Sequence, residues 1–293
     1  MQQQSDLKLF YLLMVLAMIG WGASWVHVKV LSSYLTIHEI IFYRYLLSAL
    51  SMLPLLRIMH LPLKIPRALL LNLLLASGVM IGYTWLFIAG TKLGTAGLGG
   101  AFVTTLIPIM TFLLVSLLSR RRLTKRQILA LSLGAVGVLG ILGVWNFRSE
   151  EIFRIENLYF VLAAFAWAVL TVLGSKSRTT HPLVYSFWLY LFVTLFEGLF
   201  FCRFQTPLLS QSLLVHANLI LLALFSTTFA TSIYFLGGQK IGADRISSFT
   251  FLVPFSAMGL SALFLGEEIG ASMLGGTLLA LTAIRMLNTS KKD

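Results

Sequence analysis

Two charged residues, Arg44 and Glu197, stand inside long apolar stretches of this sequence. A charge at the centre of a membrane span costs roughly 2.5–3.5 kcal/mol on insertion scales, so such residues normally face other helices or water. An arginine there attracts an anionic group such as a carboxylate, and burial favours the protonated form of a carboxyl group. We therefore expect both side chains to face a central cavity, where Arg44 contacts a substrate and Glu197 is the proton-coupling candidate.

Other roles for these two charges stay open at this point. Arg44 and Glu197 would form an ion pair if their helices are adjacent. Arg44 would otherwise extend to the membrane surface or belong to another structural ion pair. Glu197 stands about five residues from the end of its apolar stretch, so a position at the membrane interface competes with proton coupling.

Aromatic residues form a second group that could bind a solute. Trp21 and Trp167 lie well inside apolar stretches, whereas Trp and Tyr normally gather at the membrane interface. Indoles at midspan favour a cavity lining for an amphipathic or aromatic solute, with helix packing as the alternative. The aromatic candidates for substrate binding are Trp21, Trp25, Tyr83, Trp167, Trp188 and Tyr234.

Small and hydroxyl residues cluster in "GTAGLGGAFVTT" (94–105) and "GADRISSFT" (242–250). The glycines are typical of close helix packing in lipid. Pro108 and Pro254 each remove a backbone donor near midspan, which predicts a hinge beside a cavity or a simple kink. The hydroxyl groups that are candidates for contact with a substrate belong to Ser24, Thr104, Thr105, Ser247 and Ser248.

The remaining residues indicate neither catalysis nor a bound cofactor. The single Cys202 excludes an intramolecular disulfide, and the sequence holds no clustered Cys and His ligand set for a metal. No phosphate-cradling glycine–lysine motif is present, so ATP hydrolysis is unsupported. The five histidines fall at predicted helix ends or in loops, and we expect them to be solvated interface residues.

Membrane-spanning helices are the elements that must position these residues. Of the 293 residues, 58% are hydrophobic and 11% are charged, whereas a soluble domain carries about 25% charged residues. The mean hydropathy is +0.90. Windows of about 20 apolar residues predict an all-α integral membrane protein with ten spans, at 9–28, 37–56, 68–89, 95–118, 127–145, 157–174, 183–202, 213–236, 246–265 and 269–287.

The net charge of +12 is concentrated in alternate loops. Sixteen of the 22 Lys and Arg residues fall on the side that would also hold both chain ends. Because basic loops stay cytoplasmic, we expect a multi-pass protein of a bacterial-type cytoplasmic membrane with both termini inside. The run "SRRRLTKR" (119–126) would anchor this topology and contact anionic lipid headgroups. Short loops without a recognition motif argue against nucleic-acid binding.

The two halves of the sequence resemble each other at an offset of about 146 residues, so that Trp21 aligns with Trp167 and Pro108 with Pro254. Five spans in each half would place the halves in opposite orientations, which is a hallmark of secondary transporters. A duplication with only structural consequences, as in some channels, is the alternative. The predicted units are a first five-helix repeat at 1–145, an extracytoplasmic linker at 146–156 and a second repeat at 157–293.

A regular glycine series marks the fifth predicted span, where Gly134, Gly137, Gly140 and Gly143 recur every three residues. We expect this series to be a packing surface within the chain. A dimer interface is the alternative, so we expect a monomer, with a dimer as the second choice.

The chain resembles the EamA-type branch of the drug/metabolite transporter superfamily. The resemblance is carried by "IGWGASWV" (19–26), Arg44, "YTWLFIAGTKLGTAGLGGAFVTTLIPI" (83–109) and "YFLGGQKIGADRISSFTFLVPFSAMGLSALFLGEEIG" (234–270), and it covers essentially the whole chain. It implies two inverted five-helix repeats around a central cavity. The first four helices of each half would line the path, and the fifth and tenth would act as scaffold.

The two halves differ at two positions of the family pattern. The acidic motif kept at Glu267 and Glu268 is replaced in the first half by "LSRRRLT" (118–124), and Trp188 stands in the second half where Arg44 stands in the first. We therefore expect the functional polar groups to be unequally shared between the halves.

The resemblance and the repeat together predict a secondary transporter that moves a small organic metabolite by alternating access, without a cofactor. An amino acid or related compound is the favoured substrate class, with export as the favoured direction; import or exchange of a nucleoside-like or other metabolite is the alternative. A channel would show a continuous polar stripe, and an intramembrane enzyme would need convergent polar groups at depth. The expected partners are a small-molecule substrate and membrane lipids.

Overall fold

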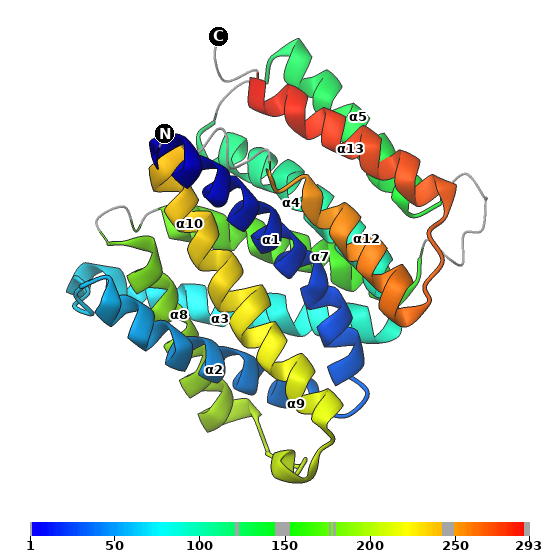
Figure 1. Cartoon of the computed structure of the whole chain (residues 1–293). Helices are drawn as coiled ribbons and strands as arrows, with labels where there is room; N and C mark the ends of the chain where they lie inside the picture. The colour runs from blue at the N-terminus through cyan, green and yellow to red at the C-terminus, as the bar shows by residue number, and fades with distance from the viewer. Residues whose placement is uncertain are drawn as a thin grey trace.

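The computed structural model describes residues 2–120, 123–143, 153–175, 177, 180–241 and 249–289. These residues form helices joined by short connections (Figure 1). The first half contains α1 (Gln2–Leu31), α2 (Ile37–Ile58), α3 (Arg67–Leu93), α4 (Ala96–Leu118) and α5 (Lys125–Ile141). The second half contains α7 (Ile155–Ser175), α8 (Pro182–Phe196) continued by η2 (Glu197–Phe201), η3 (Leu208–Ser210), the continuous rod of α9 (Leu213–Ile220), η4 (Leu221–Phe229) and α10 (Ala230–Ile241), then α12 (Leu252–Leu265) and α13 (Ala271–Thr289).

Seven of the described helices are long and apolar enough to cross a membrane. They correspond to the first four and the sixth to eighth predicted spans, and their ends differ from the predicted ones by about four residues at most. The other three are α5 with 17 residues, α12 with 14 and α13 with 19. The helical membrane fold is thus confirmed, and ten complete spans stay a prediction.

Sequence signals set several helix starts. Thr36 and Glu39 form a capping box at the start of α2, and Thr124 and Gln127 form another at the start of α5. Pro182 opens α8, where a proline removes an N–H that has no partner within the helix. These caps explain why the predicted starts of the second and fifth spans lie close to the observed ones.

The two prolines that were expected near midspan differ in position. Pro108 lies in the interior of α4, as predicted. Pro254 lies in the first turn of α12, where the N–H that it lacks would be unsatisfied by the helix in any case. Residues 242–248 lie outside the described residues, so the hinge or kink predicted at Pro254 stays a prediction.

Helix contacts repeat between the two halves. α2 packs against α8, α4 against α12, and α5 against α13. α1 packs on α12 and on the α9–η4–α10 rod, whereas α7 packs on α4 and α3. Exchanging each helix of the first half for its counterpart in the second maps these contacts onto themselves. The repeat seen in the sequence is therefore also a repeat of packing.

The glycine series of α5 lies against α13, which runs beside α5 at the edge of the molecule (Figure 1). A Cβ added at Gly137 would lie 2.5 Å from the backbone nitrogen of Ala280 and 2.8 Å from the carbonyl oxygen of Gly276. Gly134 faces Ile109 and Ala283 in the same way. The predicted packing surface is confirmed, and its partner is this chain's own last helix.

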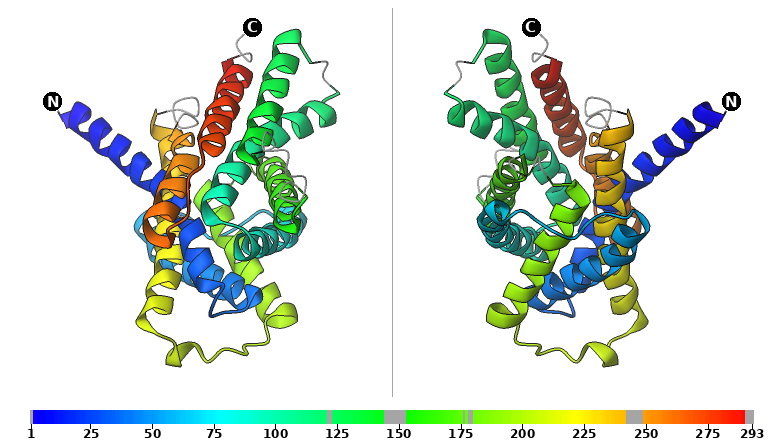
Figure 2. Two further views of the ribbon diagram at one scale, coloured as in Figure 1. Left: turned by 90° about the vertical axis from the view of Figure 1, so that its right-hand side faces the viewer. Right: turned by 90° about the vertical axis from the view of Figure 1, so that its left-hand side faces the viewer.

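Different segments of the chain lie at the two ends of the molecule. The start of α1 and the end of α13 lie at one end, and the loop over 202–212 lies at the opposite end (Figure 2). We call this opposite end the far end.

Large apolar side chains such as Leu117, Leu199 and Leu263 are more than 70% exposed, as expected for surfaces that face lipid.

Candidate functional site

Arg44 lies two turns into α2 and is buried, with 9% of its surface exposed. Its Nε donates a hydrogen bond to Oγ1 of Thr227 at 3.0 Å. Its Cζ lies 5.4 Å from the ring centroid of Tyr45 and 5.9 Å from that of Phe87, within the range of cation–π attraction. Nη1 is buried without a hydrogen-bond partner among the described residues, so the guanidinium keeps an unused donor in the interior.

Helices of both halves meet around Arg44. α2 packs against α3 in its own half and against α8 and η4 in the other. Arg44 therefore belongs to a helix that packs on segments of both halves, and its contact with a substrate stays a prediction.

Hydroxyl groups line the seam between α2 and η4. Oγ of Ser48 donates to the carbonyl oxygens of Arg44, at 2.8 Å, and of Ala223, at 3.1 Å. The hydroxyls of Ser51 and Thr228 share a hydrogen bond of 2.8 Å. η4 is a π-helical segment of nine residues, and such wide turns occur frequently at functional sites. The seam is thus a polar contact between the halves inside an apolar bundle.

Two aromatic pairs each join a helix of one half to a helix of the other. The rings of Tyr83 on α3 and Trp167 on α7 have centroids 4.7 Å apart, and those of Trp21 on α1 and Tyr234 on α10 have centroids 5.0 Å apart. Tyr83 also stacks on Phe87 at 6.0 Å, and Phe87 lies under the Arg44 guanidinium. A series of aromatic rings therefore leads from the charge of Arg44 to Trp167.

The hydroxyl groups predicted to contact a substrate donate hydrogen bonds to backbone carbonyl oxygens of their own helices. Ser24 donates to the carbonyl oxygen of Trp21 at 2.6 Å, and Thr105 to that of Ala101 at 2.7 Å. Thr104 donates likewise to its own helix and is half-buried. These hydrogen bonds leave each oxygen an acceptor, so contact with a substrate stays a prediction. Ser247 and Ser248 lie outside the described residues.

Trp25 and Trp188 are not part of the series that leads from Arg44 to Trp167, although Trp25 contacts its member Phe87. Trp25 is buried in the core, edge-on to Phe87 at 4.4 Å and to Phe160 at 5.9 Å. Trp188 donates from its indole nitrogen to the carbonyl oxygen of Leu63 at 2.7 Å, in the connection between α2 and α3. Both contacts favour structural roles for these two residues over contact with a substrate.

Glu197 stands at the first position of η2 and has no exposed surface. One carboxylate oxygen, Oε2, lies 3.0 Å from Nδ1 of His38, and the other, Oε1, has no hydrogen-bond partner among the described residues. The ion pair between Arg44 and Glu197, which the sequence left open, is not formed, because Arg44 bonds to Thr227 instead.

His38 and His27 are the residues that the sequence did not predict. His27 hydrogen-bonds through Nδ1 to the side-chain oxygen of Asn218 at 2.8 Å, and His38 contacts Glu197, so neither is simply a solvated interface residue. The repeat alone offered a signal, since it pairs the second and seventh spans. The contact between residues that lie 159 positions apart has no local pattern in the sequence.

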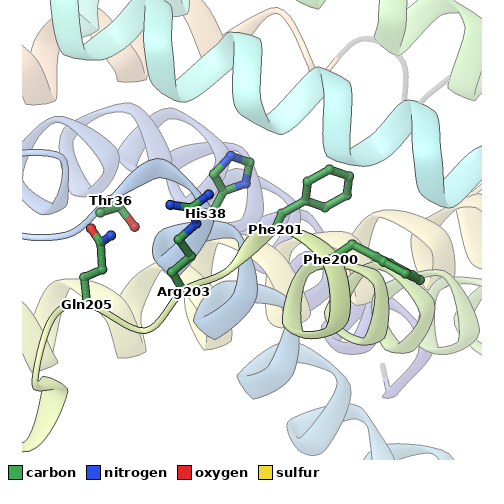
Figure 3. A pocket seen from close by; sticks show the side chains of 6 residues that line it. All are labelled: Thr36, His38, Phe200, Phe201, Arg203 and Gln205. Atoms are coloured by element: carbon green, nitrogen blue, oxygen red, sulfur yellow. The ribbon is translucent and has the colours of Figure 1, made fainter.

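A cavity of about 380 Å³ opens beside His38 at the far end of the molecule (Figure 3). Its lining residues are Thr36, His38, Phe200, Phe201, Arg203 and Gln205. Glu39 lies buried nearby and accepts hydrogen bonds from the backbone and side chain of both Thr36 and Thr206. The two bonds from Thr206 fix the loop after η2 to the start of α2.

A second polar contact at the far end joins the connection between α3 and α4 to the second half. The Glu267 carboxylate accepts from the backbone nitrogens of Ala96, at 2.8 Å, and Gly97, at 2.7 Å. Nζ of Lys29 donates to the carbonyl oxygens of Thr91 and Lys92 near the end of α3, at 3.0 and 3.1 Å. An acid at a helix start and a base at a helix end both suit the helix dipole.

Comparison with known proteins places this geometry in a family. The model of the EamA-like transporter family matches residues 8–143 and again residues 154–289. The Bacillus subtilis "Uncharacterized transporter YyaM" is 24% identical over 215 residues, which are 70% of this chain and 68% of that protein. The Synechocystis "Uncharacterized transporter sll0355" is 27% identical over 209 residues, which are 66% of this chain and 63% of that protein. A solved chain titled "Crystal structure of protein" shares the fold with a TM-score of 0.66 and 14% identity, over 97% of this chain and 98% of that one.

Proposed function

The chain belongs to the EamA-like transporter family and is a multi-pass membrane transporter, and we propose that it carries a small organic compound with a carboxylate and an apolar or aromatic body. Amino acids and related compounds are the class that this description favours. The substrate would bind where the two repeats meet, with its carboxylate on Arg44.

One observation carries this proposal, namely the unused donor of Arg44. Nη1 is buried without a partner among the described residues, while Nε is fixed by Thr227. A buried donor left unsatisfied costs about 1–3 kcal/mol, and more when the group is charged. An incoming carboxylate would satisfy this donor with a charge-assisted hydrogen bond. The same argument disfavours a cationic substrate.

The aromatic series supports the second part of the substrate description. Phe87, Tyr83 and Trp167 extend from the guanidinium in contact with one another, and Tyr83 and Trp167 are only half-buried. Aromatic faces beside a few well-placed polar groups are typical of sites that bind flat or apolar groups.

Alternating access follows from the repeat. We propose ten spans in two inverted sets of five, with both termini cytoplasmic and the far end extracytoplasmic. The mapping of helix contacts between halves supports this arrangement, because two similar halves can exchange their packing roles and open the path on either side. Glu197 would be the group that couples a proton to this exchange.

Reconstitution into liposomes tests the proposal. Vesicles containing wild-type protein are loaded with unlabelled amino acids, and counterflow is measured for a panel of radiolabelled amino acids added outside. We expect saturable counterflow of at least one member, reduced roughly 10- to 100-fold in Arg44→Ala, as for loss of a charge-assisted hydrogen bond. Arg57→Ala, which removes an exposed charge from the same helix, is the matched control and keeps wild-type counterflow. Flux that does not saturate would identify a channel instead.

A further inference from the structure

Glu197 has a buried carboxylate with one hydrogen-bond partner among the described residues, the imidazole of His38. Its carboxylate is fully buried, Oε2 lies 3.0 Å from Nδ1 of His38, and Oε1 has no partner among the described residues. A buried carboxylate without a full set of hydrogen bonds is costly. Protonation removes the buried charge and so lowers this cost. The proton between His38 and Glu197 can therefore reside either on Nδ1 of His38 or on Oε2 of Glu197.

His38 connects this buried carboxylate to the cavity at the far end. The imidazole is 34% exposed, and it lines the cavity together with Arg203 and Gln205 (Figure 3). Its ring stacks on Phe201 with a centroid distance of 5.6 Å and an interplanar angle of 13°. Stacking holds the ring so that one nitrogen meets Glu197 while the rest of its edge remains accessible to the cavity.

The other charged and titratable groups nearby do not compete for this proton. From α2, Glu39 is held by its four hydrogen bonds to Thr36 and Thr206, and the Tyr43 phenol is uncharged. From the loop after η2, burial raises the pKa of the Cys202 thiol, which keeps that thiol neutral near pH 7. Arg203 is a permanent positive charge that lines the cavity.

We propose that His38 is the proton port of Glu197, passing protons between water in the far-end cavity and the buried carboxylate. This proposal rests on the proposed function, because it names the path by which Glu197 would be loaded during transport. His38 acts here as a relay residue and does not contact the substrate.

The relay conserves protons at each step. Nε2 of neutral His38 accepts a proton from hydronium or water in the cavity, and Nδ1 then gives its own proton to Oε2 of Glu197. The carboxylate becomes a neutral acid, and the imidazole is left neutral with its proton on Nε2. Once the pair separates, Nδ1 regains a proton from water as Nε2 loses one, which restores the first tautomer.

The backbone at Glu197 suits a side chain that changes partners. Glu197 opens a π-helical turn, and its carbonyl oxygen accepts from the backbone nitrogen of Cys202 at 2.7 Å. Wide turns of this kind are rare and mark functional positions in helices. Neutralising Glu197 would weaken its attraction to His38 and release this turn from the start of α2.

Time-resolved infrared spectroscopy tests the port without any substrate. Purified protein receives a light-triggered pH drop from a caged proton, and the carbonyl band of protonated Glu197 is identified as the band absent in Glu197→Gln. We expect His38→Gln to slow the appearance of this band by roughly 100-fold, as for loss of a positioned proton donor. His216→Gln removes a histidine at the same end, whose Nδ1 lies 3.0 Å from the carbonyl oxygen of Ser212, and it keeps the wild-type rate.

Chemical rescue separates a relay from a structural role. Imidazole added to His38→Ala should restore a fast band in proportion to its concentration, whereas the same concentration of added urea should not. A wild-type rate in His38→Gln, the absence of rescue, or the absence of any band lost in Glu197→Gln would each overturn the proposal. Because no substrate is present, these outcomes are independent of whether Arg44 binds a carboxylate.

Discussion

The Nε of Arg44 and the Oγ1 of Thr227 are joined by a hydrogen bond of 3.0 Å across 183 residues of sequence. Arg44 belongs to the first repeat and Thr227 to the second, so this bond links the two halves within the bundle. It also orients the guanidinium so that Nη1 is left without a partner among the described residues. The candidate site is thus made by the meeting of the halves, and neither half holds it alone.

Thr227→Val should loosen the guanidinium while keeping the volume of the side chain. Removing the acceptor leaves a buried charged donor unpaired, which costs about 1–3 kcal/mol. We expect a lower unfolding temperature in detergent, followed by tryptophan fluorescence, and weaker counterflow. Ser51→Ala removes the neighbouring hydroxyl contact to Thr228 between uncharged groups and should cost less; an equal loss in both variants would argue against a special role for the Arg44 contact.

Trp167→Ala should raise the substrate concentration needed for half-maximal counterflow, because it removes the end of the aromatic series that begins at Phe87. Trp188→Ala provides the contrast. Its indole bonds to Leu63 in a connection between helices, so that change should lower thermal stability and leave the half-saturation concentration unchanged. Equal kinetic effects in the two variants would contradict this assignment.

Gly137→Leu should separate α5 from α13. Even a Cβ at this position would lie 2.5 Å from the backbone nitrogen of Ala280, and overpacking of a tight contact costs about 1–3 kcal/mol. We expect a lower unfolding temperature with the oligomeric state unchanged. Gly78→Ala is the control, since nothing lies within 4 Å of a Cβ there; this change should be neutral or stabilising. A change in oligomeric state in Gly137→Leu would instead favour the alternative that the glycine series forms a dimer interface.

Glu267→Gln should weaken the far-end contact by removing the charge that caps α4. The carboxylate accepts from two backbone nitrogens, those of Ala96 and Gly97, and loss of a cap costs about 0.5–2 kcal/mol. Glu268→Gln changes the neighbouring exposed acid and should leave the unfolding temperature unchanged. Matching losses in both variants would point to net charge rather than to the cap.

The helices and the repeat were predictable because they depend on local composition. Apolar windows placed the seven long spans to within a few residues, and the aligned positions Trp21 and Trp167 each face a tyrosine of the other half. Arg44 was found because charge is rare in an apolar stretch, and that rarity needs no knowledge of the fold.

The contacts of the site were less predictable because they depend on packing. The His38 contact with Glu197 and the Glu267 cap on α4 join residues far apart in sequence, and the π-helical turns at η2 and η4 have no local signature. The position of Pro254 in the first turn of α12 was hard to predict for a related reason. An apolar window shows where a span lies, whereas the start of a helix within it is set by caps and tertiary contacts.

Discrimination between an acid and its amide tests the central role of Arg44 most directly. The measurement compares counterflow of the best amino acid in the panel with counterflow of the same compound as its carboxamide, in wild type and in Arg44→Ala. We predict that wild type prefers the acid by roughly 10-fold or more, as expected for loss of a charge-assisted hydrogen bond, and that Arg44→Ala transports both equally poorly. The same preference in Arg44→Ala as in wild type, or transport of the amide as fast as the acid by wild type, would contradict this account.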